Sequence, residues 1–131
     1  MRKLVIDKNG VLAVILPDFG GMVAELSVDG AHVLRMRYES LGLSNVLSGG
    51  VPVLFPFVSR CENDEAAFRD GVYTMPMHGF AKDMPFTVER AWESGCELRL
   101  EANAATRELY PFDFVLSLRY EIEARALKTT M

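Results

Sequence analysis

Two side chains of this sequence have the chemistry of a binding site: Arg60 and His78, 18 positions apart. A guanidinium holds five donors in a fixed arrangement and suits vicinal hydroxyls or a carboxylate. An imidazole can donate to a hydroxyl group or accept from one. Each residue stands where an apolar segment leaves the predicted core, and loops on a rigid scaffold often carry binding groups. We therefore expect Arg60 and His78 to converge on one concave rim.

Both residues also have a plainer interpretation. Arg60 is followed by Glu62, Asp64 and Glu65, so a surface ion pair of little energetic value is an alternative role. A lone histidine carries no motif, and the residues alone favour a histidine satisfied by backbone groups. The acidic run also lacks the spacing of a calcium loop, so we expect a solvated loop, with no metal site and no cofactor.

Aromatic residues flank the two polar groups: Phe55, Phe57, Tyr73 and Phe80. Their rings could form the floor of a pocket by stacking on apolar faces of a ligand, although burial in a core is their default role. We take Phe57 and Phe80 as the candidates for ligand contact.

Length and composition limit the function. The 131 residues predict a single domain spanning 1–131, and the formal charge of −4 argues against a nucleic-acid partner. No signal peptide or membrane-spanning apolar run is evident, so no membrane partner is expected. Cys61 and Cys96 lie far apart without a CxxC partner, which indicates neither a disulfide framework nor a zinc site. A cytoplasmic setting with reduced thiols is predicted.

The elements that must carry these residues are short strands. Asn9-Gly10 and Asp29-Gly30 are typical of two-residue hairpin turns, and Ser94-Gly95 is assigned in the same way. Apolar and polar residues alternate over Phe112–Glu123, as in a half-buried strand. Val51–Val58 is expected to be a buried strand, and Cys61–Asp70 a loop with a short helical turn. The pattern predicts an all-β fold, an antiparallel β-sandwich or barrel.

Strand character continues from Ala126 to Met131, where the sequence stops without a turn signal. The sequence therefore looks like part of a longer fold. An edge strand without a partner exposes backbone groups, so we expect a homodimer or strand exchange through this C-terminal edge.

Three stretches carry a resemblance to a known family: GGVPVLFPFVSR (49–60), GVYTMPMHGFAKDMPFTV (71–88) and YPFDFVLSLRYEI (110–122). Together they resemble the N-terminal part of the aldose 1-epimerase (galactose mutarotase-like) family. The resemblance implies part of a galactose mutarotase-like supersandwich and a small-molecule sugar as ligand. It places Arg60 and His78 at substrate-binding positions.

The resemblance also implies that the catalytic base, a glutamate, and the catalytic acid, a second histidine, lie beyond the matched region. The first hypothesis is therefore an aldose 1-epimerase-like isomerase acting on a hexose or related sugar. Residues 1–131 would then bind sugar but contain no catalytic residue and be inactive alone. The alternatives are a non-catalytic carbohydrate-binding module and a β module that assembles with another chain.

Overall fold

The computed structural model describes residues 1–41 and 49–131, and its elements are mostly antiparallel strands. One sheet has the order β1-β2-β3-β4 and the other β10-β9-β8-β7, while β5 and β6 form a separate hairpin. The first sheet contains β1 (Leu4–Lys8), β2 (Val11–Leu16), β3 (Met22–Val28) and β4 (Ala31–Arg35). The second contains β7 (Thr87–Trp92), β8 (Gly95–Glu101), β9 (Val115–Glu123) and β10 (Ala126–Thr130), and the hairpin β5 (Glu65–Phe68) and β6 (Gly71–Thr74).

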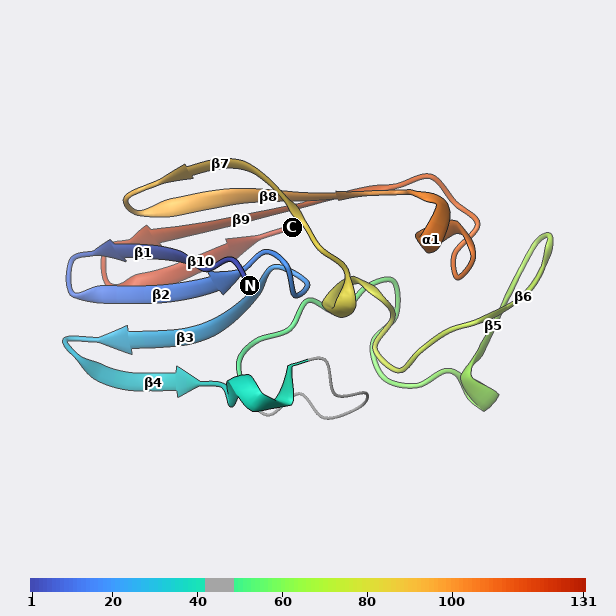
Figure 1. The fold of residues 1–131 in the computed structure, drawn as a ribbon, viewed down its shortest axis with the longest axis horizontal. Helices are drawn as coiled ribbons and strands as arrows, with labels where there is room; N and C mark the ends of the chain where they lie inside the picture. The colour runs from blue at the N-terminus through green and yellow to red at the C-terminus, as the bar shows by residue number, and fades with distance from the viewer. Residues whose placement is uncertain (42–48) are drawn as a thin grey trace.

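Short helical turns connect some of the strands: η1 (Tyr38–Ser40), η2 (Glu62–Asp64), η3 (Ala81–Asp83) and α1 (Ala104–Arg107). Figure 1 shows the two four-stranded sheets as stacked layers and the β5–β6 hairpin at one end of the molecule. The predicted all-β antiparallel sandwich is confirmed. Residues 38–48 do not fit a strand pattern, and their sequence predicts a loop or a short helical turn; η1 is such a turn, and residues 42–48 lie outside the described part of the chain.

The main core lies between the two sheets. Alternate residues of β2, Val11, Ala13 and Ile15, are at most 1% exposed and pack in one cluster with Leu98 and Leu118 of the opposite sheet. Tyr120 on β9 donates its hydroxyl to the carbonyl of Gly21 at 2.8 Å, across the sandwich. This buried hydrogen bond joins the two layers and leaves neither group unpaired.

The other face of the first sheet is also covered. Val14 and Leu16 of β2 point away from the main core and form a second cluster with Met22, Ala24 and Met36. Strand β2 is therefore buried on both sides, which explains why its sequence, VLAVIL, is continuously apolar instead of alternating.

The predicted Asn9-Gly10 and Asp29-Gly30 turns are confirmed, since all four residues have positive φ (53°, 77°, 51° and 78°). The prediction for Ser94-Gly95 is off by one residue, because Gly95 is the first residue of β8. A Cβ on Gly95 would lie 2.5 Å from the Trp92 ring and from the Tyr120 carbonyl oxygen. Close packing, not turn geometry, therefore requires glycine there.

The strand predicted for Val51–Val58 does not form. The segment makes only isolated bridges, Val51 with Val23 and Phe55 with Gly79, and the Phe55–Pro56 peptide bond is cis. Pro52 and Pro56 lack the N–H group that a continuous ladder needs. The predicted loop at Cys61–Asp70 is wrong in its second half, where β5 pairs with β6 over four residues.

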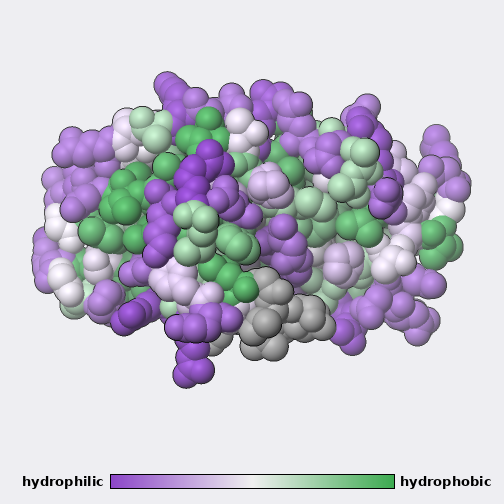
Figure 2. Space-filling view, in the orientation of Figure 1, coloured by the Kyte–Doolittle hydropathy of each residue, from purple (hydrophilic) through white to green (hydrophobic). Residues whose placement is uncertain are grey.

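The surface is mixed in character. On the face seen in Figure 2, hydrophilic side chains dominate the outline and hydrophobic ones form separate patches. Within residues 1–41 and 49–131, no helix is long and apolar enough to span a membrane.

Candidate functional site

The two segments that carry Arg60 and His78 lie side by side. Phe55 and Gly79 form a parallel bridge, and the Phe55 carbonyl accepts hydrogen bonds from the backbone N–H groups of Phe80 (2.9 Å) and Ala81 (3.2 Å). Gly79 has φ +73°, and a Cβ there would lie 2.0 Å from the Phe55 oxygen. Only glycine allows this approach, so the residue after His78 is fixed by packing.

His78 and Ser59 form a reciprocal pair of hydrogen bonds. The His78 N–H donates to the Ser59 carbonyl at 2.8 Å, and the Ser59 N–H donates to Nδ1 of His78 at 2.9 Å. Both residues have left-handed backbones, with φ +67° and +72°. Such conformations are uncommon outside glycine and are often found at functional sites. Since Nδ1 accepts, the neutral ring carries its proton on Nε2.

The imidazole of His78 is half-buried, and among the described residues no hydrogen bond involves Nε2. The ring therefore offers one N–H donor to a ligand. Arg60 directly follows Ser59, the residue that His78 binds, so the backbones of Arg60 and His78 lie close together. Convergence of the two side chains on one rim stays a prediction.

Arg60 is exposed and forms an ion pair within its own loop. Its Nε lies 3.1 Å from Oδ1 of Asp64, with the two side chains 60% and 48% exposed. The plainer interpretation of Arg60 was therefore correct about the partner. The pair still leaves both terminal guanidinium nitrogens to bind acceptor oxygens, since the described residues provide them with no hydrogen bond or ion pair.

Aromatic rings form a continuous layer behind these groups. Phe80 is 1% exposed and packs edge-on against Phe55, with ring centroids 5.9 Å apart, and against Tyr110 and Phe114. Its ring is thus a support beneath the site rather than an exposed contact surface, which corrects the expected role. Phe57 stacks on Phe68 of β5, with ring centroids 6.3 Å apart. Phe57 is only half-buried, so part of its surface stays accessible.

The stretch YPFDF belongs to the same layer. The ring centroids of Tyr110 and Phe112 lie 4.9 Å apart, and the ring of Phe68 packs against both. The β5–β6 hairpin is thereby anchored to the segment that leads into β9. This packing holds the loop that follows Arg60 against the body of the fold.

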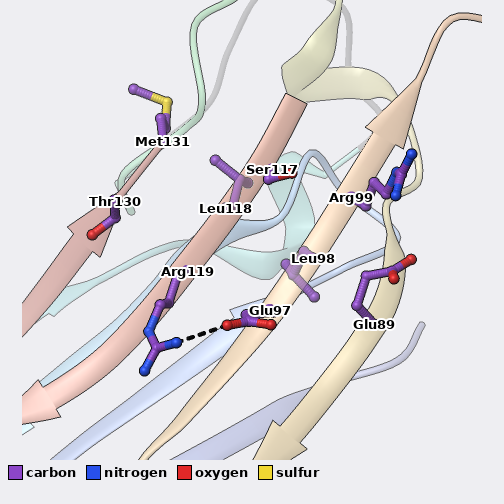
Figure 3. A pocket seen from close by; sticks show the side chains of 9 residues that line it. All are labelled: Glu89, Glu97, Leu98, Arg99, Ser117, Leu118, Arg119, Thr130 and Met131. Atoms are coloured by element: carbon purple, nitrogen blue, oxygen red, sulfur yellow. Dashed lines mark hydrogen bonds and ion pairs between the residues drawn. The ribbon is translucent and has the colours of Figure 1, made fainter. Parts of the chain in front are cut away.

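A separate cavity of about 280 Å³ lies on the sheet of β7–β10. Its lining comes from all four strands and Met131, as Figure 3 shows: Glu89, Glu97, Leu98, Arg99, Ser117, Leu118, Arg119, Thr130 and Met131. None of Phe57, Arg60, His78 and Phe80 lines it. The cavity is therefore no part of the predicted site.

Charges beside this cavity pair with one another. Glu97 accepts two hydrogen bonds from Arg90 (2.7 and 3.0 Å) and one from Arg119 (2.8 Å). These bonds, the Arg90 pair first, hold the pKa of Glu97 below its usual value. Both guanidinium groups also lie over the Trp92 ring, with the Cζ atoms of Arg90 and Arg119 at 5.3 and 5.2 Å from the ring centroid. Arg119 also pairs with Glu121, so the two guanidinium groups and two carboxylates of the cluster neutralise one another, as is typical of a structural sheet surface.

Other candidate groups lie elsewhere. His32 is exposed on β4, in register with Ser27 of the first sheet. Cys61 is half-buried and Cys96 buried, and both thiols are free. Burial, with a smaller effect of Glu97, raises the pKa of Cys96 to about 11. Within the described chain, no group of three or more His, Cys, Asp or Glu side chains could hold a metal ion.

Sequence reasoning missed one member of the site, Ser59, and treated Asp64 only as one of several carboxylates. Ser59 acts through its backbone, which leaves no signal in residue type. The i,i+4 spacing of Arg60 and Asp64 is a signal in the sequence, although it is a rule for α-helices and this loop contains only the short turn η2.

Comparisons with known proteins show the family of the chain. The family model described as aldose 1-epimerase matches residues 2–131. A protein of Salmonella typhimurium named putative glucose-6-phosphate 1-epimerase is 31% identical over 127 residues, which cover 85% of this chain and 40% of that protein. The chain thus spans less than half the length of this relative.

Solved structures give the same result. A protein from Synechocystis sp. PCC 6803 superposes with a TM-score of 0.88 at 28% identity, covering 98% of this chain and 46% of that one. The galactose mutarotase related enzyme from Lactobacillus acidophilus has a TM-score of 0.80 at 27% identity, covering 94% and 40%. The resemblance of the three sequence stretches is therefore confirmed. The chain belongs to the aldose 1-epimerase family and corresponds to its N-terminal part.

Proposed function

We propose that the protein is an isomerase of the aldose 1-epimerase type and that residues 1–131 supply part of its sugar-binding site. The observation that carries this proposal is the Ser59–His78 pair, which fixes the imidazole next to Arg60. Arg60 and His78 then present N–H donors, which match the acceptor oxygens of a cyclic sugar. The exposed part of Phe57 is proposed to contact an apolar sugar face.

Mutarotation opens a sugar ring and closes it on the other face. It needs a base at the anomeric hydroxyl and an acid at the ring oxygen. Arg60 and His78 are proposed to hold and polarise the substrate and not to perform these proton transfers. Asp64 is a poor candidate for the base, because its carboxylate is paired with Arg60.

The substrate class is proposed to be a hexose or a hexose phosphate. The first fits the relative named as a galactose mutarotase related enzyme, and the second fits the relative named as a putative glucose-6-phosphate 1-epimerase. An exposed guanidinium donates hydrogen bonds either to vicinal hydroxyls or to a phosphate. A phosphate would add a charge-assisted interaction, so the phosphorylated sugar should bind more tightly if it contacts Arg60.

Isothermal titration with D-galactose and with glucose 6-phosphate tests the proposal. Arg60→Ala and His78→Asn should each weaken binding, and asparagine is chosen because it tolerates the left-handed backbone of His78. Arg125→Ala is a matched control, since Arg125 is 59% exposed and pairs with Asp29 at a distant hairpin. Unchanged isotherms for both site variants would refute the proposed site.

A non-catalytic carbohydrate-binding module is the second candidate. The observation that favours it is that the nearest carboxylate to Arg60 is engaged and that His32 lies on the outer strand β4. This candidate predicts sugar binding without mutarotation, even in the longest natural form of the protein.

A further inference from the structure

Asp64 makes a separate contact with each of its polar groups. Its N–H donates to the Cys61 carbonyl at 3.0 Å, and its own carbonyl accepts from the Met75 N–H at 2.7 Å. Its side chain faces Arg60. Asn63 and Asp64 both have left-handed backbones, with φ +55° and +56°. These two residues turn the chain so that the carboxylate returns to the arginine four positions earlier.

The backbone contacts of Asp64 connect the two halves of the site. Met75 follows β6 and leads within three residues to His78, while Cys61 follows Arg60. The chain is thus held against the segment from Met75 to His78 on both sides of Arg60, at Ser59 before it and at Asp64 after it. Two such attachments define the position of the Arg60 backbone but not the direction of its long side chain.

The carboxylate of Asp64 can fix the direction of the Arg60 side chain, which the backbone contacts leave open. Oδ1 is covered by the protein and lacks an aligned hydrogen bond, although the side chain as a whole is 48% exposed. The nearest cationic atom is Nε of Arg60, at 3.1 Å. Because the carboxylate engages Nε, the flat fork of the two terminal nitrogens has no partner among the described residues and is left to bind a ligand.

We propose that Asp64 is a positioning residue that orients the guanidinium of Arg60 for ligand binding. The inference rests on the proposed sugar-binding function and adds a residue to it. The opposite effect on ligand affinity is also conceivable in physical terms: a carboxylate that masked Arg60 would compete with the oxygens of a ligand and weaken binding. The two effects differ in sign, so removing the charge of Asp64 distinguishes them.

Asp64→Asn is the decisive variant. Asparagine has the same shape and tolerates a left-handed backbone, so the turn and the Met75 hydrogen bond are retained. Glu62→Gln is the matched control, because Glu62 lies in the same turn, is exposed and has no ion pair with any described residue. Amide spectra of both variants should match the wild type outside residues 60–64.

The first readout needs no ligand. In wild-type protein, the heteronuclear NOE at Nε of Arg60 should indicate a restricted side chain, and it should fall in Asp64→Asn but not in Glu62→Gln. An unchanged NOE in Asp64→Asn would overturn the inference. Because this measurement is made without sugar, it judges the role of Asp64 even if the proposed function fails.

The second readout is binding of glucose 6-phosphate and D-galactose. Asp64→Asn should raise Kd about two- to fivefold, the range expected for losing one exposed ion pair. In an Arg60→Lys background the same change should have no further effect, because lysine has no Nε fork to orient. Tighter binding by Asp64→Asn would indicate masking and overturn the proposal, as would an unchanged Kd. Absence of binding by the wild type would refute the proposed function instead.

Discussion

Ser59 and His78 hold each other through two hydrogen bonds, backbone to backbone at 2.8 Å and backbone to imidazole at 2.9 Å. Because a backbone N–H can only donate, Nδ1 of His78 must be unprotonated while this contact exists. We predict that the neutral ring is the Nε2–H tautomer. Long-range proton–nitrogen correlation spectra of the two histidines measure this directly. A protonated Nδ1 at neutral pH would contradict the prediction, and exposed His32 serves as the internal comparison.

Gly79→Ala should unfold the site. Alanine would have to adopt φ +73°, and its Cβ would meet the Phe55 oxygen at 2.0 Å. Strain and overlap together should lower the free energy of unfolding by about 3 kcal/mol or more. Gly30→Ala is the control for strain alone, since Gly30 has φ +78° but no atom within 4 Å of the added Cβ; about 1–2 kcal/mol is expected there. Urea unfolding measures both free energies. Equal losses of the free energy of unfolding in Gly79→Ala and Gly30→Ala would show that the close approach to Phe55 is absent.

Tyr120→Phe should weaken the contact between the layers. The change removes the hydroxyl that donates to Gly21 and leaves a buried carbonyl unpaired, which costs about 1–3 kcal/mol. Tyr73→Phe removes a comparable bond to Asp70 at an exposed position and should change stability by less than about 0.5 kcal/mol. Chemical denaturation measures both variants. Equal denaturation midpoints for Tyr120→Phe and Tyr73→Phe would contradict a stabilising buried hydrogen bond at Tyr120.

Cys96 should make stability depend on alkaline pH. Its pKa of about 11 in the folded chain exceeds the ordinary value of 9.0, so the unfolded chain loses this proton first as pH rises. Its contribution to stability is therefore complete below pH 9 and is lost between pH 9 and 11. Between pH 9 and 11 the free energy of unfolding should fall less steeply with rising pH in Cys96→Ala than in the wild type. Identical slopes would show that the thiol is not protected.

The edge strand β10 should support self-association. It is paired on one side with β9, and no other described strand pairs with it. Lys128 is exposed, as are Thr129 and Thr130, which leaves little charge to oppose pairing with another edge. Sedimentation should detect a dimer at high protein concentration, and Thr129→Lys should shift it toward monomer. A wild-type chain that stays monomeric would contradict this prediction.

The hairpins of the first sheet could be predicted because asparagine or aspartate followed by glycine specifies the turn locally. The β5–β6 hairpin could not. Ala66 and Ala67 have little strand propensity, and the hairpin depends on Phe68 packing against Tyr110 and Phe112 far along the chain. Tertiary packing therefore decided an element that local sequence described as a loop.

The same distinction applies to the site. Arg60 and His78 could be selected from residue type and from the family resemblance. Their relative placement depends on the close approach of Gly79 to Phe55 and on backbone bonds of Ser59. Backbone groups are common to all residues, so no sequence pattern reveals such contacts.

The chain of residues 1–131 alone should not accelerate mutarotation measurably. Each positioned acid or base contributes on the order of 10²–10⁴-fold, and Arg60 and His78 are proposed as binding groups only. Binding the substrate and the transition state equally well does not raise kcat. Polarimetry on fresh α-D-galactose measures this. A rate above buffer that disappears in His78→Asn would assign catalysis to this part of the protein.

The central claim is that a sugar binds beside the Ser59–His78 pair, and amide chemical-shift mapping tests it most directly. Titration with D-galactose and with glucose 6-phosphate should shift the amide signals of Ser59, Arg60, His78 and Gly79, and Arg60→Ala should suppress these shifts. Signals around Arg99 and Arg119, which line the separate cavity, should stay in place. Shifts confined to that cavity, or none with either sugar, would contradict the account.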